Sequence, residues 1–128
     1  VDQSIIDKLV KSKNNITMAI DTLKVLAGTM RVAIDNTYIK NITTTTADEA
    51  DGNFIGISKF NQKGCELLVN EMSNIIDSHF DDYYTLAIDN LARRGVNVGY
   101  CDVKNHFWTE IDTKEEYDYL VRKINQFF

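Results

Sequence analysis

Apolar and polar residues follow two different periods along this chain, one typical of strands and one typical of helices. The strand-like stretches are short, rich in β-branched residues and bounded by polar turns. They lie at residues 16–20, 30–34, 37–43, 54–58 and 96–101, with a last extended segment at 108–112. The helix-like stretches repeat apolar residues every three or four positions. They lie near residues 5–10, at 63–77, at 82–94 and from 114 onward. Hairpin-type and helical connections thus occur together, which predicts an α/β fold with a mixed sheet.

Each predicted helix has an apolar face that we expect to lie against the sheet. These faces are Ile5, Ile6, Leu9 and Val10; Cys65, Leu68, Met72, Ile75 and Ile76; Tyr84, Ala87, Ile88 and Leu91; and Tyr117, Leu120, Val121 and Ile124. Ser4 with Asp7 is expected to cap the first helix, and Gly95 is expected to end the third. Thr113 with Glu116 fits a capping box for the last helix.

The strands carry two local signals. Gly56 inside a strand predicts a bulge or the close approach of another backbone or a ligand. The pair Asp35-Asn36 predicts a turn, so residues 30–43 are expected to form a hairpin or meander. The acidic stretch 43–52 lacks an apolar period and is expected to be an exposed loop.

Composition sets the broad class of the protein. The 128 residues, with 44% hydrophobic and 26% charged residues, predict one ordinary globular domain spanning 1–128. No apolar run is long enough to cross a membrane, and the net charge of −5 argues against a nucleic-acid partner. Cys65 and Cys101 lie in apolar patterns without metal-ligand spacing, so we expect buried free thiols in a reducing cytoplasm.

Two carboxylates stand out where an extended segment passes into the last helix. Glu110 and Asp112 are two residues apart, which in a strand places both side chains on one face. Two carboxylates aimed at one point suit a hard cation such as Mg²⁺. The alternative is structural, because Asp112 or Thr113 would also serve as the cap of the following helix.

A second candidate site is aromatic and acidic. Aromatic faces beside carboxylates suit a small cationic ligand, through cation–π attraction and charge pairing. The candidates are Phe80, Asp81, Tyr83, Tyr84 and Trp108. In the alternative interpretation an aspartate caps a helix and the aromatic residues belong to the core. The glycines never cluster, so the chain contains no phosphate-binding glycine-rich loop.

Four motifs together resemble the C-terminal half of a nucleotidyltransferase of the sugar-phosphate type, closest to the cytidylyltransferases that activate phosphocholine or small phosphonates. A Trp-x-Glu-Ile-Asp-Thr segment leading into the last helix is matched at 108–113. A Gly-x-x-Ile-Gly-x-x-Lys-Phe strand is matched at 52–60, and a Tyr-Tyr-x-x-Ala-x-x-x-Leu helix at 83–91. The strand ending in an Ile-Asp pair is matched at 16–21.

This resemblance implies a Rossmann-like mixed sheet, of which this chain is the C-terminal portion only. It implies Mg²⁺-dependent transfer of CMP from CTP to a small phosphorylated or phosphonate acceptor, with release of pyrophosphate. Glu110 and Asp112 would supply the metal carboxylates, and the aromatic residues would bind the acceptor. The nucleotide loop, the catalytic basic residues and a further metal aspartate of the family would belong to an N-terminal half.

The chain begins at Val1 in what resembles the entrance to a helix, so we expect a fragment that is inactive alone. Its expected partners are CTP, the acceptor and the N-terminal half of the same enzyme, with a homodimer as a further candidate. The alternative function is a non-catalytic small-ligand-binding module or a pseudoenzyme of the same fold.

Overall fold

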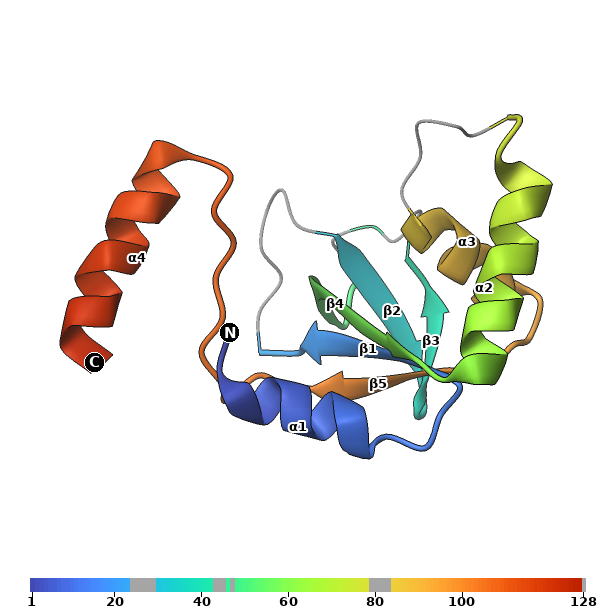
Figure 1. Ribbon diagram of the computed structural model, residues 1–128, viewed down its shortest axis with the longest axis horizontal. Coiled ribbons are helices and arrows are strands. Elements are labelled where there is room, and N and C mark those ends of the chain that lie inside the picture. The colour runs from blue at the N-terminus through green and yellow to red at the C-terminus, as the bar shows by residue number, and fades with distance from the viewer. Residues whose placement is uncertain (24–29, 43–45, 47, 79–83, 128) are drawn as a thin grey trace.

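The computed structural model describes residues 1–23, 30–42, 46, 48–78 and 84–127. Within these residues the chain forms five strands and four helices (Figure 1). In chain order they are α1 (Gln3–Lys11), β1 (Ile16–Asp21), β2 (Arg31–Asp35), β3 (Tyr38–Asn41), β4 (Gly52–Phe60), α2 (Gln62–Ile75), α3 (Tyr84–Arg93), β5 (Val98–Asp102) and α4 (Lys114–Phe127). The mixed α/β class is confirmed. The loop prediction at 43–52 lies partly outside the described residues.

The five described strands close into a barrel in the order β1-β4-β2-β3-β5, with β5 returning to β1. β1 and β5 run parallel, and the other neighbouring pairs are antiparallel. β1 is buried along its whole length, which explains why its sequence is almost continuously apolar. The mixed sheet is therefore confirmed, whereas its Rossmann-like arrangement stays a prediction.

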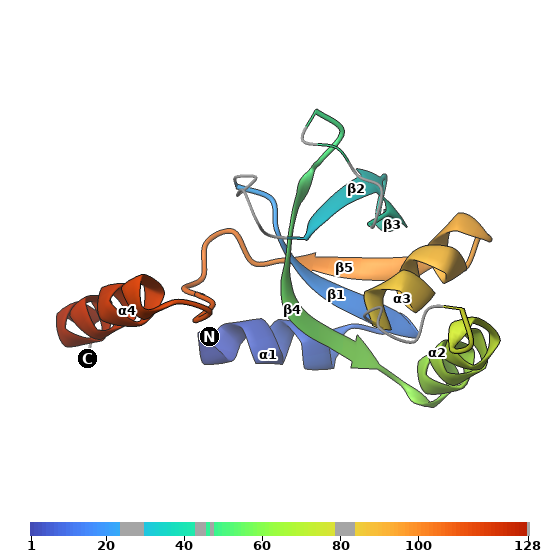
Figure 2. The same cartoon turned by 90° about the horizontal axis from the view of Figure 1, so that it is seen from above.

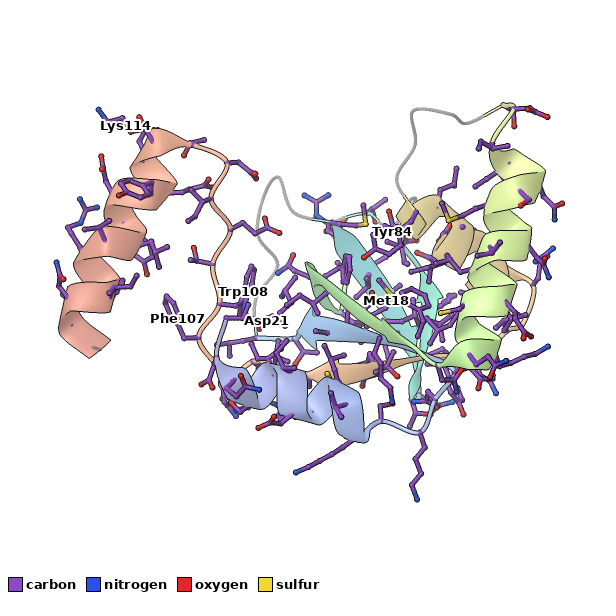
Figure 3. The ribbon with its side chains drawn as sticks, viewed as in Figure 1. Met18, Asp21, Tyr84, Phe107, Trp108 and Lys114 are labelled. Carbon is purple, nitrogen blue, oxygen red and sulfur yellow. The ribbon has the colours of Figure 1, made fainter. Side chains whose placement is uncertain are left out.

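β1 divides the interior into two hydrophobic clusters because successive side chains point to opposite faces of a strand. Ile16, Met18 and Ile20 belong to the first cluster, which packs against α3 (Figure 3). Ala19 belongs to the second cluster, with Ile5 and Leu9 of α1, Ile55, Val103 and, at its margin, Ile57, Cys101 and Trp108. The second cluster thereby connects β1 to the segment that follows β5.

Both local signals in the strands are confirmed. Gly56 has φ +88°, and the pairing of β1 with β4 shifts register beside it, between Met18 and Ile20. This is the bulge that the strand glycine predicted. Asn36 has φ 55° in the turn between β2 and β3, which pair as an antiparallel hairpin.

The inward face of α2 agrees with the prediction only in part, because Leu68 packs beside the first hydrophobic cluster but other predicted positions do not. Cys65 is exposed, and Met72 and Ile76 are 40% and 53% exposed. The buried positions of this helix are Gly64 and Glu71. A Cβ at Gly64 would collide with the carbonyl oxygen of Asn15, so the missing side chain is what lets the helix approach β1.

The burial of Glu71 explains why the inward face of α2 is not wholly the predicted apolar face. Its carboxylate pairs with the Arg94 guanidinium just beyond α3, which compensates the burial of the charge. Apolar periodicity detects neither a glycine contact nor a buried ion pair. The prediction for α3 is confirmed, because Ala87, Ile88 and Leu91 are buried and Gly95 has φ +90° at the end of the helix.

α1 begins two residues earlier than expected. Asp2, and not Ser4, is the N-cap, and its carboxylate accepts a hydrogen bond from the backbone N–H of Ser4 at 3.0 Å. Ile5 and Leu9 are buried as predicted, whereas Val10 is 66% exposed. The backbone N–H of Asp2 donates to the carbonyl of Phe107 at 2.9 Å, so the start of α1 is joined to the chain beyond β5.

α4 lies apart from the barrel in both views (Figures 1 and 2). The predicted apolar face is therefore uncovered among the described residues, with Tyr117, Val121 and Ile124 all exposed. Figure 2 also shows α1 alongside β1, on the side of the barrel nearer to α4. In the part of the chain that the structure describes, no helix is long and apolar enough to cross a membrane.

Candidate functional site at the carboxyl ends of β1 and β5

The parallel strands β1 and β5 end side by side. Ile20 of β1 is paired with Asp102 of β5, and the backbone N–H of Val103 donates to the carbonyl of Ile20 at 2.9 Å. Asp21 and Asp102 therefore occupy the same edge of the barrel, which we call the β1–β5 edge. The carboxyl ends of parallel strands are where α/β proteins commonly place their ligands.

Asp102 fixes the backbone at this edge. Its carboxylate accepts hydrogen bonds from the hydroxyl and the backbone N–H of Thr22 and from the backbone N–H of Lys104. Partial burial raises the pKa of Asp102, but these hydrogen bonds outweigh burial, so the pKa is below its ordinary value. Asp102 is a structural residue that joins the ends of the two strands.

Asp21 has a different partner. It is 4% exposed, and its Oδ1 accepts the backbone N–H of Leu23 at 2.9 Å. Its Oδ2 accepts the indole N–H of Trp108 at 2.7 Å, although the two residues are 87 positions apart (Figure 3). The sequence indicated Asp21 only as the end of a strand. The available signal was a carboxylate at the end of a buried apolar strand, which requires a hydrogen-bond donor.

The chain between β5 and Trp108 is anchored to α1 and β1. His106 Nδ1 and Ser4 Oγ are 2.8 Å apart, and the carbonyl of Phe107 accepts the N–H of Asp2. Trp108 itself packs at the margin of the second hydrophobic cluster. These contacts hold the start of the segment 108–112 against the β1–β5 edge.

Glu110 and Asp112 lie in an irregular part of the chain that pairs with no described strand. Partial burial raises the pKa of Glu110, and the negative charges of Asp112 and Glu116 raise it further. The carboxylates thus lie close enough to repel one another. Among the described residues, none donates a hydrogen bond to the carboxylate of Glu110 or to that of Asp112.

The start of α4 decides between the two interpretations of the helix cap. The hydroxyl of Thr113 accepts the N–H of Glu116 at 3.2 Å, and Glu116 accepts the N–H of Thr113 at 2.9 Å. This is the predicted capping box. Asp112 contributes only its backbone N–H, which donates to Glu116 at 2.7 Å. The cap is Thr113, and the Asp112 carboxylate has no capping role.

The aromatic candidates are not gathered into one place. Phe80, Asp81 and Tyr83 lie outside the described residues. Tyr84 packs edge-to-face on Phe60, with ring centroids 6.4 Å apart, beside the first hydrophobic cluster. Trp108 lies in the second cluster, well away from Tyr84 (Figure 3). A small acceptor at Trp108 would therefore not reach Tyr84 in this conformation.

Two further observations concern metal-holding groups and cavities. Among the described residues, no group of three or more His, Cys, Asp or Glu side chains could hold a metal ion. Glu110 and Asp112 belong to no such group. An open groove of about 740 Å³ lies elsewhere, between the β2–β3 hairpin and the end of α3, and none of the predicted site residues lines it.

Comparisons with known proteins agree with this architecture. No protein-family model matches the sequence, and no curated protein matches it. Among solved structures, the chain is similar to the inositol-1-phosphate CTP transferase from T. maritima, with a TM-score of 0.67 and 16% sequence identity. The similarity covers 91% of this chain and 47% of that one, so this chain spans about half the length of its neighbour. At this identity, the chain shares the fold of part of a nucleotidyltransferase.

Proposed function

We propose that this chain is the metal-contributing and acceptor-binding part of a cytidylyltransferase. The reaction would transfer CMP from CTP to a small phosphorylated or phosphonate acceptor. An acceptor oxygen would form a bond to the α-phosphorus of CTP, the bond from that phosphorus to the bridging oxygen would break, and pyrophosphate would leave. The observation that supports the proposal is the pair Glu110 and Asp112, which closely follows Trp108, whose indole N–H is bonded to Asp21 at the β1–β5 edge.

Two carboxylates so close in the chain would suit a Mg²⁺ ion. Mg²⁺ commonly binds one or two protein carboxylates and completes its shell with water and substrate phosphates. Glu110 and Asp112 supply two carboxylates that are not used for helix capping, and their mutual repulsion would be relieved by a cation. When bound, Mg²⁺ would neutralise the charge that develops on the transferred phosphoryl group.

The remaining roles belong to the chain's own residues. Trp108 would present one face of its indole to the acceptor, while its N–H stays bonded to Asp21. Phe80, Asp81 and Tyr83 stay candidates for the acceptor site, and Tyr84 would serve the acceptor only if it approached this edge. A cationic acceptor such as phosphocholine would use the aromatic faces. An aminoethyl phosphonate would use an aspartate, and inositol 1-phosphate, the substrate named for the structural neighbour, is a third candidate.

The nucleotide would be bound by another part of the enzyme. The chain has no glycine-rich loop, and more than half of the neighbouring enzyme has no counterpart in it. A Rossmann-like sheet, a cytoplasmic location and the expected inactivity of the isolated chain belong to the same proposal.

The test is an assay of pyrophosphate release with CTP, Mg²⁺ and the three acceptors. It is run on this chain alone and on the longest reading frame that contains it. We expect no release and no tight CTP binding by the chain alone. We expect release by the longer protein, and loss of release in its Glu110→Gln variant. Acceptor binding without release from either protein would instead favour the non-catalytic ligand-binding module.

A further inference from the structure

Among the described residues, Asp21 is the side chain that accepts the indole N–H of Trp108, and both of its carboxylate oxygens are used. Oδ1 accepts the N–H of Leu23 and Oδ2 accepts the indole N–H. The residue is almost fully buried at the end of β1, a strand that pairs on both sides. A rigid strand therefore holds the acceptor of this hydrogen bond, and the donor lies on an irregular segment.

We infer that Asp21 is a positioning residue, whose hydrogen bond to Trp108 sets the place of Glu110 and Asp112. The inference rests on the proposed function, because it assigns the carboxylate pair a role that depends on its position. Asp21 is not itself a metal ligand in this account. It acts through the indole, as residues behind metal ligands commonly do.

The contacts before Trp108 and after Asp112 show why the hydrogen bond between Asp21 and Trp108 matters for the position of the two carboxylates. Before Trp108, the chain is held at Phe107 by the N–H of Asp2. After Asp112, it is held by the capping box of Thr113 and Glu116. α4 does not pack on the barrel, so the capping box fixes the carboxylates to the helix but not to the β1–β5 edge. Trp108 is the last residue before Glu110 whose side chain is bonded to the barrel.

The number of hydrogen-bond acceptors at position 21 predicts what replacing Asp21 does to its two N–H partners. An asparagine at this position has one acceptor oxygen, whereas two N–H donors, from Leu23 and Trp108, require acceptors. Asp21→Asn therefore leaves one of these donors unsatisfied without emptying the core. Trp108→Phe removes the indole donor and keeps an aromatic ring. The two variants break the same hydrogen bond from opposite sides.

Asp102→Asn is the matched control. Asp102 ends the neighbouring strand and also accepts backbone and side-chain hydrogen bonds, but its partners are Thr22 and Lys104. A general weakening of the β1–β5 edge would affect both aspartate variants equally. A positioning role affects Asp21→Asn alone.

The experiment titrates the chain with Mn²⁺, used in place of Mg²⁺, and follows the paramagnetic broadening of backbone amide signals at 109–113. We expect Asp21→Asn and Trp108→Phe each to weaken Mn²⁺ binding by about 10-fold to 100-fold, the range for residues behind metal ligands. The double variant should be no weaker than either single variant, because the two changes remove one interaction. Asp102→Asn should bind as the unmodified chain does. Unchanged binding in Asp21→Asn would overturn the inference.

A second readout separates this inference from the proposed function. Trp108 is the only tryptophan in the chain, so tryptophan fluorescence reports the surroundings of this one side chain. In metal-free Asp21→Asn, we expect red-shifted emission and faster hydrogen exchange at 109–112. If the unmodified chain binds no Mn²⁺ at this pair, the metal assignment fails, and these metal-free measurements still decide whether Asp21 fixes the segment. Unchanged emission and exchange would overturn it.

Discussion

Thr113 and Glu116 cap each other at the start of α4, each accepting the backbone N–H of the other. This reciprocal contact satisfies the helix terminus without the side chain of Asp112. A residue type that commonly caps helices is thereby left available for another role.

The first prediction separates these two positions. Thr113→Ala should weaken α4 by about 1 kcal/mol, the usual loss when a capping hydroxyl is removed. Asp112→Asn should leave the helix content unchanged. Carbon chemical shifts at 114–126 and far-ultraviolet circular dichroism measure both effects. An equal loss of helix in Asp112→Asn would return Asp112 to a capping role.

The second prediction concerns the buried carboxylate that joins β3 to α3. Asp89 Oδ1 accepts the backbone N–H of Ile42 at 2.6 Å, and its Oδ2 accepts the Arg93 Nε at 2.8 Å. Asp89→Ala should lower the free energy of unfolding by about 3 kcal/mol, because it leaves a buried N–H unsatisfied and removes the charge partner of Arg93. Urea denaturation measures the loss.

Arg93→Gln is the control for Asp89. The arginine side chain is 43% exposed, so its removal should cost less than the removal of Asp89. A larger loss in Arg93→Gln than in Asp89→Ala would show that the ion pair, and not the hydrogen bond to β3, dominates this contact.

The third prediction concerns the charge of Glu110. Its pKa is raised by burial and by Asp112 and Glu116, so the folded chain holds this proton more tightly than the unfolded chain. The contribution of Glu110 to stability is therefore most favourable below its ordinary pKa of about 4.3 and declines as pH rises through the raised pKa. Without divalent cations, Glu110→Gln should stabilise the chain at neutral pH, by less than about 1 kcal/mol.

The matched control is Glu115→Gln, which removes a charge on α4 that is not among those raising the pKa of Glu110. Thermal unfolding in a chelating buffer compares the two variants. Equal changes in both would mean that general charge reduction, and not local repulsion at Glu110, causes the effect.

The fourth prediction concerns acid stability. The pKa of folded Asp102 is below its ordinary value because its hydrogen bonds outweigh the opposing effect of burial. Its stabilisation is complete above about pH 4 and is lost as pH falls through the lowered pKa. Asp102→Asn should therefore flatten the fall in unfolding free energy below pH 4, in a series of urea denaturations. Asp118→Asn, on α4, should leave that fall unchanged.

The sequence predicted most elements of this fold because each carries a local signal. β1 is almost continuously apolar, the turn at Asn36 and the bulge at Gly56 have residues suited to positive φ, and α3 has a clear apolar face. The face of α2 was predicted only in part: Leu68 packs beside the first cluster, whereas other predicted positions are exposed because the contacts of the helix depend on Gly64 and on the Glu71–Arg94 pair. Cys65 was expected to be buried because it belongs to the predicted apolar face, and it is exposed.

The candidate site was only partly predictable. Glu110 and Asp112 were found from their spacing and from a resemblance, and the capping box from a local motif. The contact between Asp21 and Trp108 was not found, since two residues so far apart in the chain share no local pattern. The separation of Tyr84 from Trp108 likewise follows from their membership of different hydrophobic clusters, which no sequence period reveals.

The most direct test of the account is a Mn²⁺ titration of the unmodified chain beside two double variants, followed by amide broadening. One variant carries Glu110→Gln and Asp112→Asn, and the other carries Glu115→Gln and Asp118→Asn as a control with the same charge change. We expect broadening that is strongest at 109–113 in the unmodified chain and the control, and its loss in the first variant. Broadening that persists at 109–113 without Glu110 and Asp112, or that is lost equally in both variants, would contradict the account.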